Sequence, residues 1–136
     1  MKQRAGFGTL GLLAGVAFAA GFPVHAHHSF GATYNLKTEI TLQGRLVQFM
    51  FRNPHSFVHV EVPDEQGVVH RWSVEWSAAG ALTRQGVDRG TLRVGDEVTI
   101  TAYPSRTPGE FRAQMLTLRR PLDGLTWGER SGEVVD

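Results

Sequence analysis

Apolar and polar residues alternate along most of the chain between residues 38 and 120. Stretches with this period lie at residues 38–51, 56–62, 68–76, 95–104 and 111–120. A period of two is typical of a strand that buries one face. The pattern therefore predicts five strands, and Gly44 inside the first of them predicts a bulge or a sharp bend. In the last two strands the expected core residues are Val98 and Ile100, then Met115 or Leu116 together with Leu118.

The second and third stretches predict an antiparallel hairpin that turns at residues 63–67. If Val62 lies opposite Val68, then His55 lies opposite Glu75 on the face without the valines. The other pairs expected on that face are Phe57 with Ser73 and His59 with Arg71. A histidine across from a glutamate is either a hydrogen-bonded surface pair or a metal ligand with a carboxylate beside it.

Residues 77–86 break the alternation and predict one short helix. Ser77 is suited to the N-cap position, and Gly86 is suited to the stop. A helix between the third and fourth of five strands is the order of the OB-fold, a five-stranded Greek-key barrel. The predicted fold class is therefore all-β with one short helix, and a small β-sandwich is the alternative.

Residues 1–26 have the pattern of a secretory signal peptide. Lys2 and Arg4 precede an uncharged apolar stretch, and small residues stand at the positions required for a cut after Ala26. A cut after Ala19 and an uncleaved anchor are the alternatives. Cleavage after Ala26 predicts a periplasmic or secreted protein with no stable membrane span. It would have an extended segment at residues 27–37, a barrel at 38–120 and a flexible tail at 121–136.

Charge and composition exclude several classes of function. Without the leader the chain has 12 basic and 13 acidic residues, which gives no basic patch for a nucleic acid. It has no cysteine, which excludes disulfides, thiolate metal sites and cysteine catalysis. It also has no serine elbow, phosphate loop or dinucleotide fingerprint. The sequence therefore assigns no catalytic residue and favours a binding protein over an enzyme.

Three of the six histidines, His25, His27 and His28, lie at the end of the leader. A cut after Ala26 removes His25 and gives His27 both an α-amine and an imidazole, which can chelate one metal ion. A third nitrogen from His55, with His59 in reserve, would complete a planar set that suits Cu(II). This arrangement resembles the histidine brace of copper monooxygenases and of some periplasmic copper carriers. The predicted metal-site residues are His27, His28, His55, His59 and Glu75, with Glu75 behind a ligand or in an axial position and His28 either ligating or pointing away.

Other interpretations of the same residues stay open. His27 and His28 can be a terminus that binds nothing in particular, and His70 is expected to be structural. Without metal, the face that carries Phe57, Ser73 and Arg71 would bind a partner protein, a peptide or a saccharide, as OB-folds do. A copper oxidase or oxygenase is a third and weaker hypothesis. The aromatic residues that could line a ligand face but more often belong to a core are Phe49, Phe51, Phe57 and Trp76.

Several motifs resemble a bacterial secreted family catalogued as a domain of unknown function, number six-one-five-two. They are HHSF at residues 27–30, NPHSF at 53–57, WSVEW at 72–76, ALTRQGVDRGTLRVGD at 81–96 and YPSR at 103–106. The resemblance implies export and a shared fold, and it implies no activity. Tyr34 is followed by Asn35, whereas the family has an acidic residue near the aromatic one, which weakens a carboxylate ligand at that point.

Overall fold

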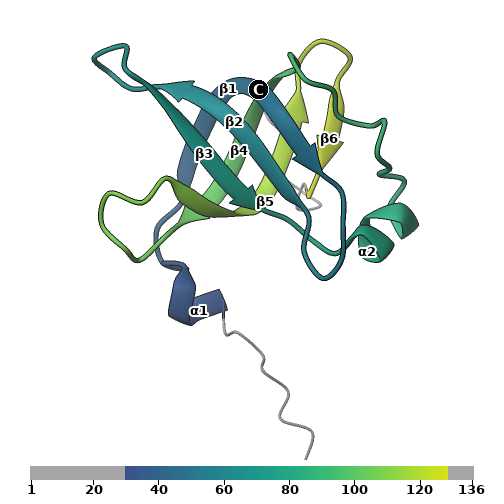
Figure 1. Cartoon of the computed structure of the whole chain (residues 1–136), viewed down its shortest axis with the longest axis horizontal. Coiled ribbons are helices and arrows are strands. Elements are labelled where there is room, and N and C mark those ends of the chain that lie inside the picture. The colour runs from purple at the N-terminus through teal and green to yellow at the C-terminus, as the bar shows by residue number, and fades with distance from the viewer. Residues whose placement is uncertain (1–29, 129–136) are drawn as a thin grey trace, which may run out of the picture.

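The computed structural model describes residues 30–128, which fold into a small β-barrel with two short helices (Figure 1). The helices are α1 (Phe30–Thr33) and α2 (Ala79–Arg84). The strands are β1 (Ile40–Met50), β2 (Phe57–Pro63), β3 (Val69–Glu75), β4 (Glu97–Pro104), β5 (Arg112–Arg120) and β6 (Leu125–Trp127).

Strand pairing closes the first five strands into a barrel. β1 pairs with β2 on one side and with β4 on the other, and β2–β3 and β4–β5 are also antiparallel. A parallel pairing of β3 with β5 closes the ring. Since α2 lies between β3 and β4, this is the predicted OB-fold arrangement, and the OB-fold prediction is confirmed over the β-sandwich.

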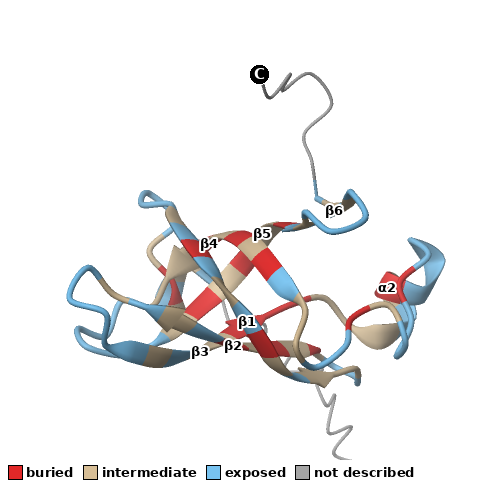
Figure 2. Ribbon diagram, turned by 90° about the horizontal axis from the view of Figure 1, so that it is seen from above, coloured by how far each residue is buried: buried red, intermediate tan, exposed pale blue. Residues whose placement is uncertain are grey.

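The core fills the inside of the barrel with the apolar positions of the alternating pattern, drawn red in Figure 2. The strand residues with no exposed surface are Leu46, Val58, Val74, Ile100, Ala102, Ala113 and Leu118. The register of the β4–β5 pair shifts between Thr101 and Ala102, which leaves Leu116 as an extra residue in β5. This bulge turns Met115 and Leu118 to the same side, so both are buried although they are three positions apart.

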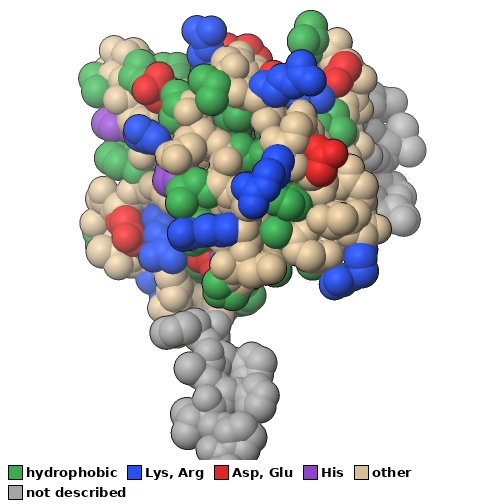
Figure 3. Space-filling model, turned by 45° about the vertical axis from the view of Figure 1, so that its right-hand side comes forward, with side chains coloured by type: hydrophobic (Ala, Val, Ile, Leu, Met, Phe, Trp, Pro, Cys, Tyr) green, Lys and Arg blue, Asp and Glu red, His purple; other side chains and the backbone are tan. Residues whose placement is uncertain are grey.

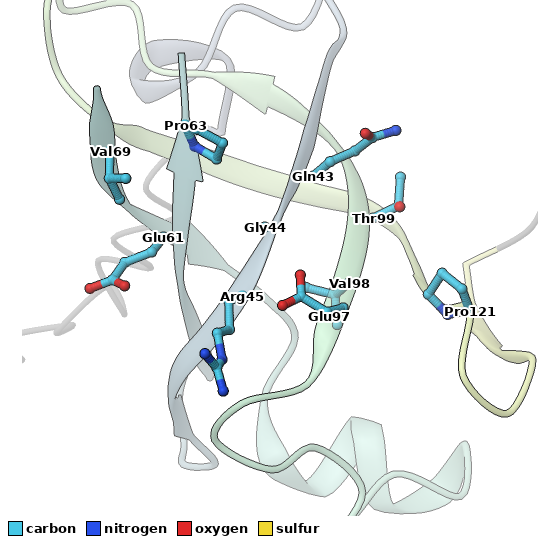
Figure 4. Close-up of a pocket in the computed structure, with 10 residues that line it drawn as sticks. All are labelled: Gln43, Gly44, Arg45, Glu61, Pro63, Val69, Glu97, Val98, Thr99 and Pro121. Carbon is cyan, nitrogen blue, oxygen red and sulfur yellow. The ribbon is translucent and has the colours of Figure 1, made fainter. Parts of the chain in front are cut away.

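Gly44 allows a close approach of two strands. A Cβ atom at this position would lie 2.3 Å from the carbonyl oxygen of Glu61 and 2.8 Å from a methyl group of Val62. The expected bulge is not at Gly44, because the register of β1 against β2 shifts between Leu46 and Gln48. Figure 4 shows Gly44 on the middle strand of a surface hollow, between the strand that carries Glu61 and the strand that carries Thr99.

The register predicted for the β2–β3 hairpin is wrong by two residues. Phe57 rather than His55 lies opposite Glu75, and His59 lies opposite Ser73 rather than Arg71. The turn explains the difference, because Asp64 Oδ1 accepts hydrogen bonds from the backbone N–H groups of Gln66 and Val68 at 2.9 and 2.8 Å. These bonds close a loop over residues 64–68 and move the first pair to Pro63 and Val69.

The helix and both ends of the described chain also differ from the prediction. The N-cap residue of α2 is Ala78 rather than Ser77, whereas Gly86 follows the helix with the positive φ of 83° that was expected of a stop. The segment predicted to be extended contains α1. The tail predicted to be flexible contains β6, because the Trp127 ring packs edge-on against the core residue Trp76 with centroids 5.0 Å apart. No helix within residues 30–128 is both long and apolar enough to cross a membrane.

Replacing Gly44 with alanine is expected to destabilise the barrel by about 1–3 kcal/mol, since the new methyl group would overlap the backbone of β2. Chemical denaturation measures the change in the free energy of unfolding. Gly80→Ala is the matched control, because the nearest atom to a Cβ there is 4.0 Å away, and it should be neutral or slightly stabilising. Equal stabilities for the two variants would contradict the close approach.

Candidate functional site

Glu75, the last residue of β3, is a buried carboxylate with three side-chain partners. It is 8% exposed. Its Oε2 accepts a hydrogen bond from the Tyr34 hydroxyl and another from Arg112 Nη2 at 3.1 Å. Its Oε1 lies 3.1 Å from His55 Nδ1. A buried charge is tolerated where it is paired and hydrogen-bonded, and Glu75 meets both conditions.

Two of these partners are placed by the closing of the barrel. In the parallel pairing of β3 with β5, Arg112 lies beside Ser73, two residues before Glu75. Tyr34 is fixed from the other side by a bridge to Ser105, just after β4. Arg112 Nε donates to the Tyr34 hydroxyl at 3.0 Å, which links the two partners to each other. Burial, and then the hydrogen bond to Glu75, raise the pKa of the Tyr34 phenol well above its usual value.

His55 is held beside Glu75 by the backbone of its neighbour Ser56. The Ser56 N–H donates to the Ser77 carbonyl at 3.1 Å, and the Ser56 carbonyl accepts from Trp76 N–H at 2.8 Å. These bonds continue the β2–β3 pairing beyond the strand ends. They explain why His55 still meets Glu75 although the predicted register is wrong. A neutral His55 ring with its proton on Nδ1 would direct that N–H toward Glu75 Oε1 and would keep the Nε2 lone pair for a ligand.

The start of the described chain lies against the same histidine. The Phe30 and His55 rings meet edge to face, with centroids 5.9 Å apart. The predicted ligands His27 and His28 lie outside the described residues. His27 is three positions before Phe30, and three residues span at most about 10 Å.

The structure places His59 in a different environment from His55. His59 Nε2 lies 3.3 Å from Met50 Sδ, on the outer side of β2. Burial, then the nearby Arg71 and Arg52, lower the pKa of the His59 ring. Within residues 30–128, no hydrogen bond or ion pair joins His59 to Glu75. Within residues 30–128, no three His, Cys, Asp or Glu side chains are grouped so that they could hold a metal ion.

The remaining histidine and the aromatic residues mostly serve the fold. His70 lies 2.9 Å from Asp64 Oδ2 and stacks on Phe111 with ring centroids 4.2 Å apart, as expected of a structural residue. Phe49 and Phe51 pack against the core, and Trp76 belongs to it. Phe57 instead lines a cavity at the site.

Two cavities adjoin the His55–Glu75 pair. The first, of about 370 Å³, has walls formed by Phe30, Thr33, Tyr34, Arg52, Pro54, His55, Phe57, Glu75 and Arg112. The second, of about 360 Å³, shares Phe30, Pro54, His55 and Glu75 with it and extends to Trp76 and Gln114. In the part of the chain that the structure describes, the buried Trp76 Nε1 and Gln114 Oε1 atoms have no hydrogen-bond partner.

Four residues of this site were not predicted from the sequence: Phe30, Tyr34, Arg52 and Arg112. Arg112 could not be found from local pattern, because it reaches Glu75 only through the pairing of β3 with β5. Tyr34 occupies the aromatic position that follows the HHSF start in the similar family, and that position was a usable signal.

Fold and site together define a small OB-fold barrel with a buried glutamate that links an arginine, a tyrosine and a histidine. The chain matches the model of a family of unknown function, DUF6152, over residues 15–112, and it belongs to that family. Among solved structures it is similar to the mitochondrial single-stranded DNA-binding protein Rim1 of S. cerevisiae. The identity is 12% and the TM-score 0.47, with 62% of this chain and 93% of that chain covered. No curated protein matches the chain.

The Tyr34 hydroxyl is expected to stay protonated above the usual phenol pKa of 10.0, because the phenol is buried and donates a hydrogen bond to Glu75. Phenolate absorbance during an alkaline titration measures this. The rise in phenolate absorbance above pH 10 that belongs to Tyr34 should be missing in the Tyr34→Phe variant. A Tyr34→Phe variant that keeps the absorbance step above pH 10 would show that the step belongs to another group, and would contradict the raised pKa of Tyr34.

Proposed function

We propose that this protein is exported to the periplasm and binds one copper ion through its first residue, in metal handling or sensing. Cleavage after Ala26 makes His27 that residue, and its α-amine and imidazole supply two nitrogens. His55 Nε2 supplies the third. Such a set of nitrogens in one plane suits Cu(II), which also binds most tightly among the common divalent ions.

The observation that carries the proposal is the contact between His55 Nδ1 and Glu75 Oε1 at 3.1 Å. Metal-binding histidines commonly donate their second ring N–H to a carboxylate, which fixes the ring and makes the other nitrogen a better ligand. Glu75 is itself held by Tyr34 and Arg112. The His55 ring is therefore oriented before any metal arrives.

The position of Phe30 supports the participation of His27. Its ring already lies on His55, so the chain reaches the site three residues after the proposed first ligand. The centroids of the Phe30 and His55 rings are 5.9 Å apart, and three residues can span about 10 Å. The N-terminal chelate and His55 can then meet without a change in the barrel.

Glu75 is assigned to orienting His55 rather than to binding the metal, because both its oxygens already have partners. His28 is assigned no ligand atom. His59 is not assigned to the site either, since its Nε2 contacts Met50 and its neighbours include two arginines. In this arrangement His27 and His55 would bind the metal, and Glu75 would orient His55.

Titration of the processed protein with Cu(II) should show one tight site per chain. N-terminal acetylation of the processed protein should remove most of this affinity, because the His27 nitrogen is then an amide rather than an amine. N-terminal sequencing of the exported protein establishes where the chain begins. Equal Cu(II) affinity with and without the acetyl group would overturn the chelate.

Substitutions at His55 and Glu75 test the other half of the site. Glu75→Gln is expected to weaken Cu(II) binding by about 10–100-fold, as loss of a carboxylate behind a metal-binding histidine does. His55→Ala should weaken it more, because a ligand is lost. His70→Ala, which removes a histidine bonded to Asp64, is the control and should bind as the parent does. A fall in affinity in His70→Ala equal to that in His55→Ala would contradict the assignment.

A further inference from the structure

The cavity beside His55 has two arginines in its walls. Arg52 comes from the loop after β1, and Arg112 comes from the start of β5. Glu75 is the one acidic residue among the residues that line this cavity, and it offsets one of the two positive charges. The Tyr34 hydroxyl adds no charge, because it is protonated. The cavity therefore has a net positive charge even with His55 neutral.

The two arginines keep hydrogen-bond donors for a ligand. Arg112 uses Nε for the Tyr34 hydroxyl and Nη2 for Glu75, and Nη1 donates no hydrogen bond to any residue from 30 to 128. The Arg52 guanidinium lies 5.3 Å from the centre of the Phe57 ring. Within the same described residues its side chain also has no hydrogen-bond partner.

Both arginines are positioned before a ligand arrives. The Arg52 backbone is tied on both sides, since its N–H donates to Ser56 Oγ at 3.2 Å and its carbonyl accepts from Ala79 N–H at 3.1 Å. The two bonds to Tyr34 and Glu75 fix the Arg112 plane. Figure 3 shows several basic side chains close together on one face of the molecule.

We infer that this cavity binds a small oxyanion, a carboxylate or a phosphate, between Arg52 and Arg112. Guanidinium groups recognise both by paired charge-assisted hydrogen bonds. The volume of about 370 Å³ accommodates a small organic acid or phosphate ester as well as the bare anion. His55 lies in the same wall and offers one more polar atom. Anion binding in this cavity does not require copper. A negative result for the anion would therefore leave the proposed copper site untouched, and a negative result for copper would leave the anion site untouched.

Titration of the metal-free processed protein with inorganic phosphate and, separately, with acetate tests the inference. Amide chemical shifts are the readout, with a chelator present and the ionic strength held constant. The expected result is saturable binding of at least one anion, with the shifts centred on residues 52–57, Glu75 and Arg112. The ratio of the two affinities then separates a phosphate site from a carboxylate site. Shifts that rise linearly with anion concentration, or that spread over the whole surface, would overturn the inference.

Arg52→Ala should weaken binding of the preferred anion by about tenfold, the effect of losing one charge-assisted hydrogen bond. Arg89→Ala is the matched control, since Arg89 also lies over a phenylalanine, 5.6 Å from the Phe51 ring, and is not among the residues that line this cavity. Equal losses in the two variants would show a general charge effect and overturn the site. If Arg52→Ala unfolds, Arg52→Gln and Arg112→Lys replace it. Both should bind more weakly than the parent protein, and unchanged binding in both would overturn the site.

Discussion

The burial of the Glu75 carboxylate is the constraint on which the site depends. A charge that is 8% exposed must be paired, and the three partners of this one come from distant parts of the chain. Tyr34 precedes the barrel, His55 belongs to the loop between β1 and β2, and Arg112 begins β5. Arg112 reaches Glu75 through the pairing of β3 with β5, whereas His55 reaches it through the bonds that continue the β2–β3 pairing. Closing the barrel thus completes the site, and removal of any one partner leaves a buried charge less well satisfied.

Much of the fold could be predicted because burial in a barrel follows a period of two. The alternating stretches gave five strands, and the helix between the third and fourth gave the topology. The contact between His55 and Glu75 was predicted for a reason that proved partly wrong. A register error of two residues keeps every side chain on its predicted face, whereas an error of one would have reversed the faces. The glutamate therefore stayed on the side of His55, and the backbone bonds of Ser56 brought the two together.

The rest could not be read from local pattern, because it depends on contacts between distant segments. The strand β6 exists because Trp127 packs on Trp76 and its indole N–H donates to Gln85 Oε1 at 2.5 Å. Nothing in the glycine-rich stretch after Pro121 indicates those partners. The turn at Asp64 is similar, since one side-chain oxygen decides the register of the whole hairpin. The local sequence around Arg52 and around Arg112 contains no pattern that marks either residue as part of a site. Only the closed barrel places both arginines in the wall of one cavity.

The two proposed ligands would share a wall and carry opposite charges. A copper ion on His55 Nε2 would add positive charge to a cavity that already contains Arg52 and Arg112, and an oxyanion there would offset that charge. Such coupling is reciprocal, so the anion would raise the affinity for copper by the same factor as copper raises the affinity for the anion. Glu75 contributes to both sites indirectly, because its Oε1 orients His55 and its Oε2 orients Arg112. A single buried carboxylate would thus fix the position of His55, which binds the copper ion, relative to Arg112, which binds the anion.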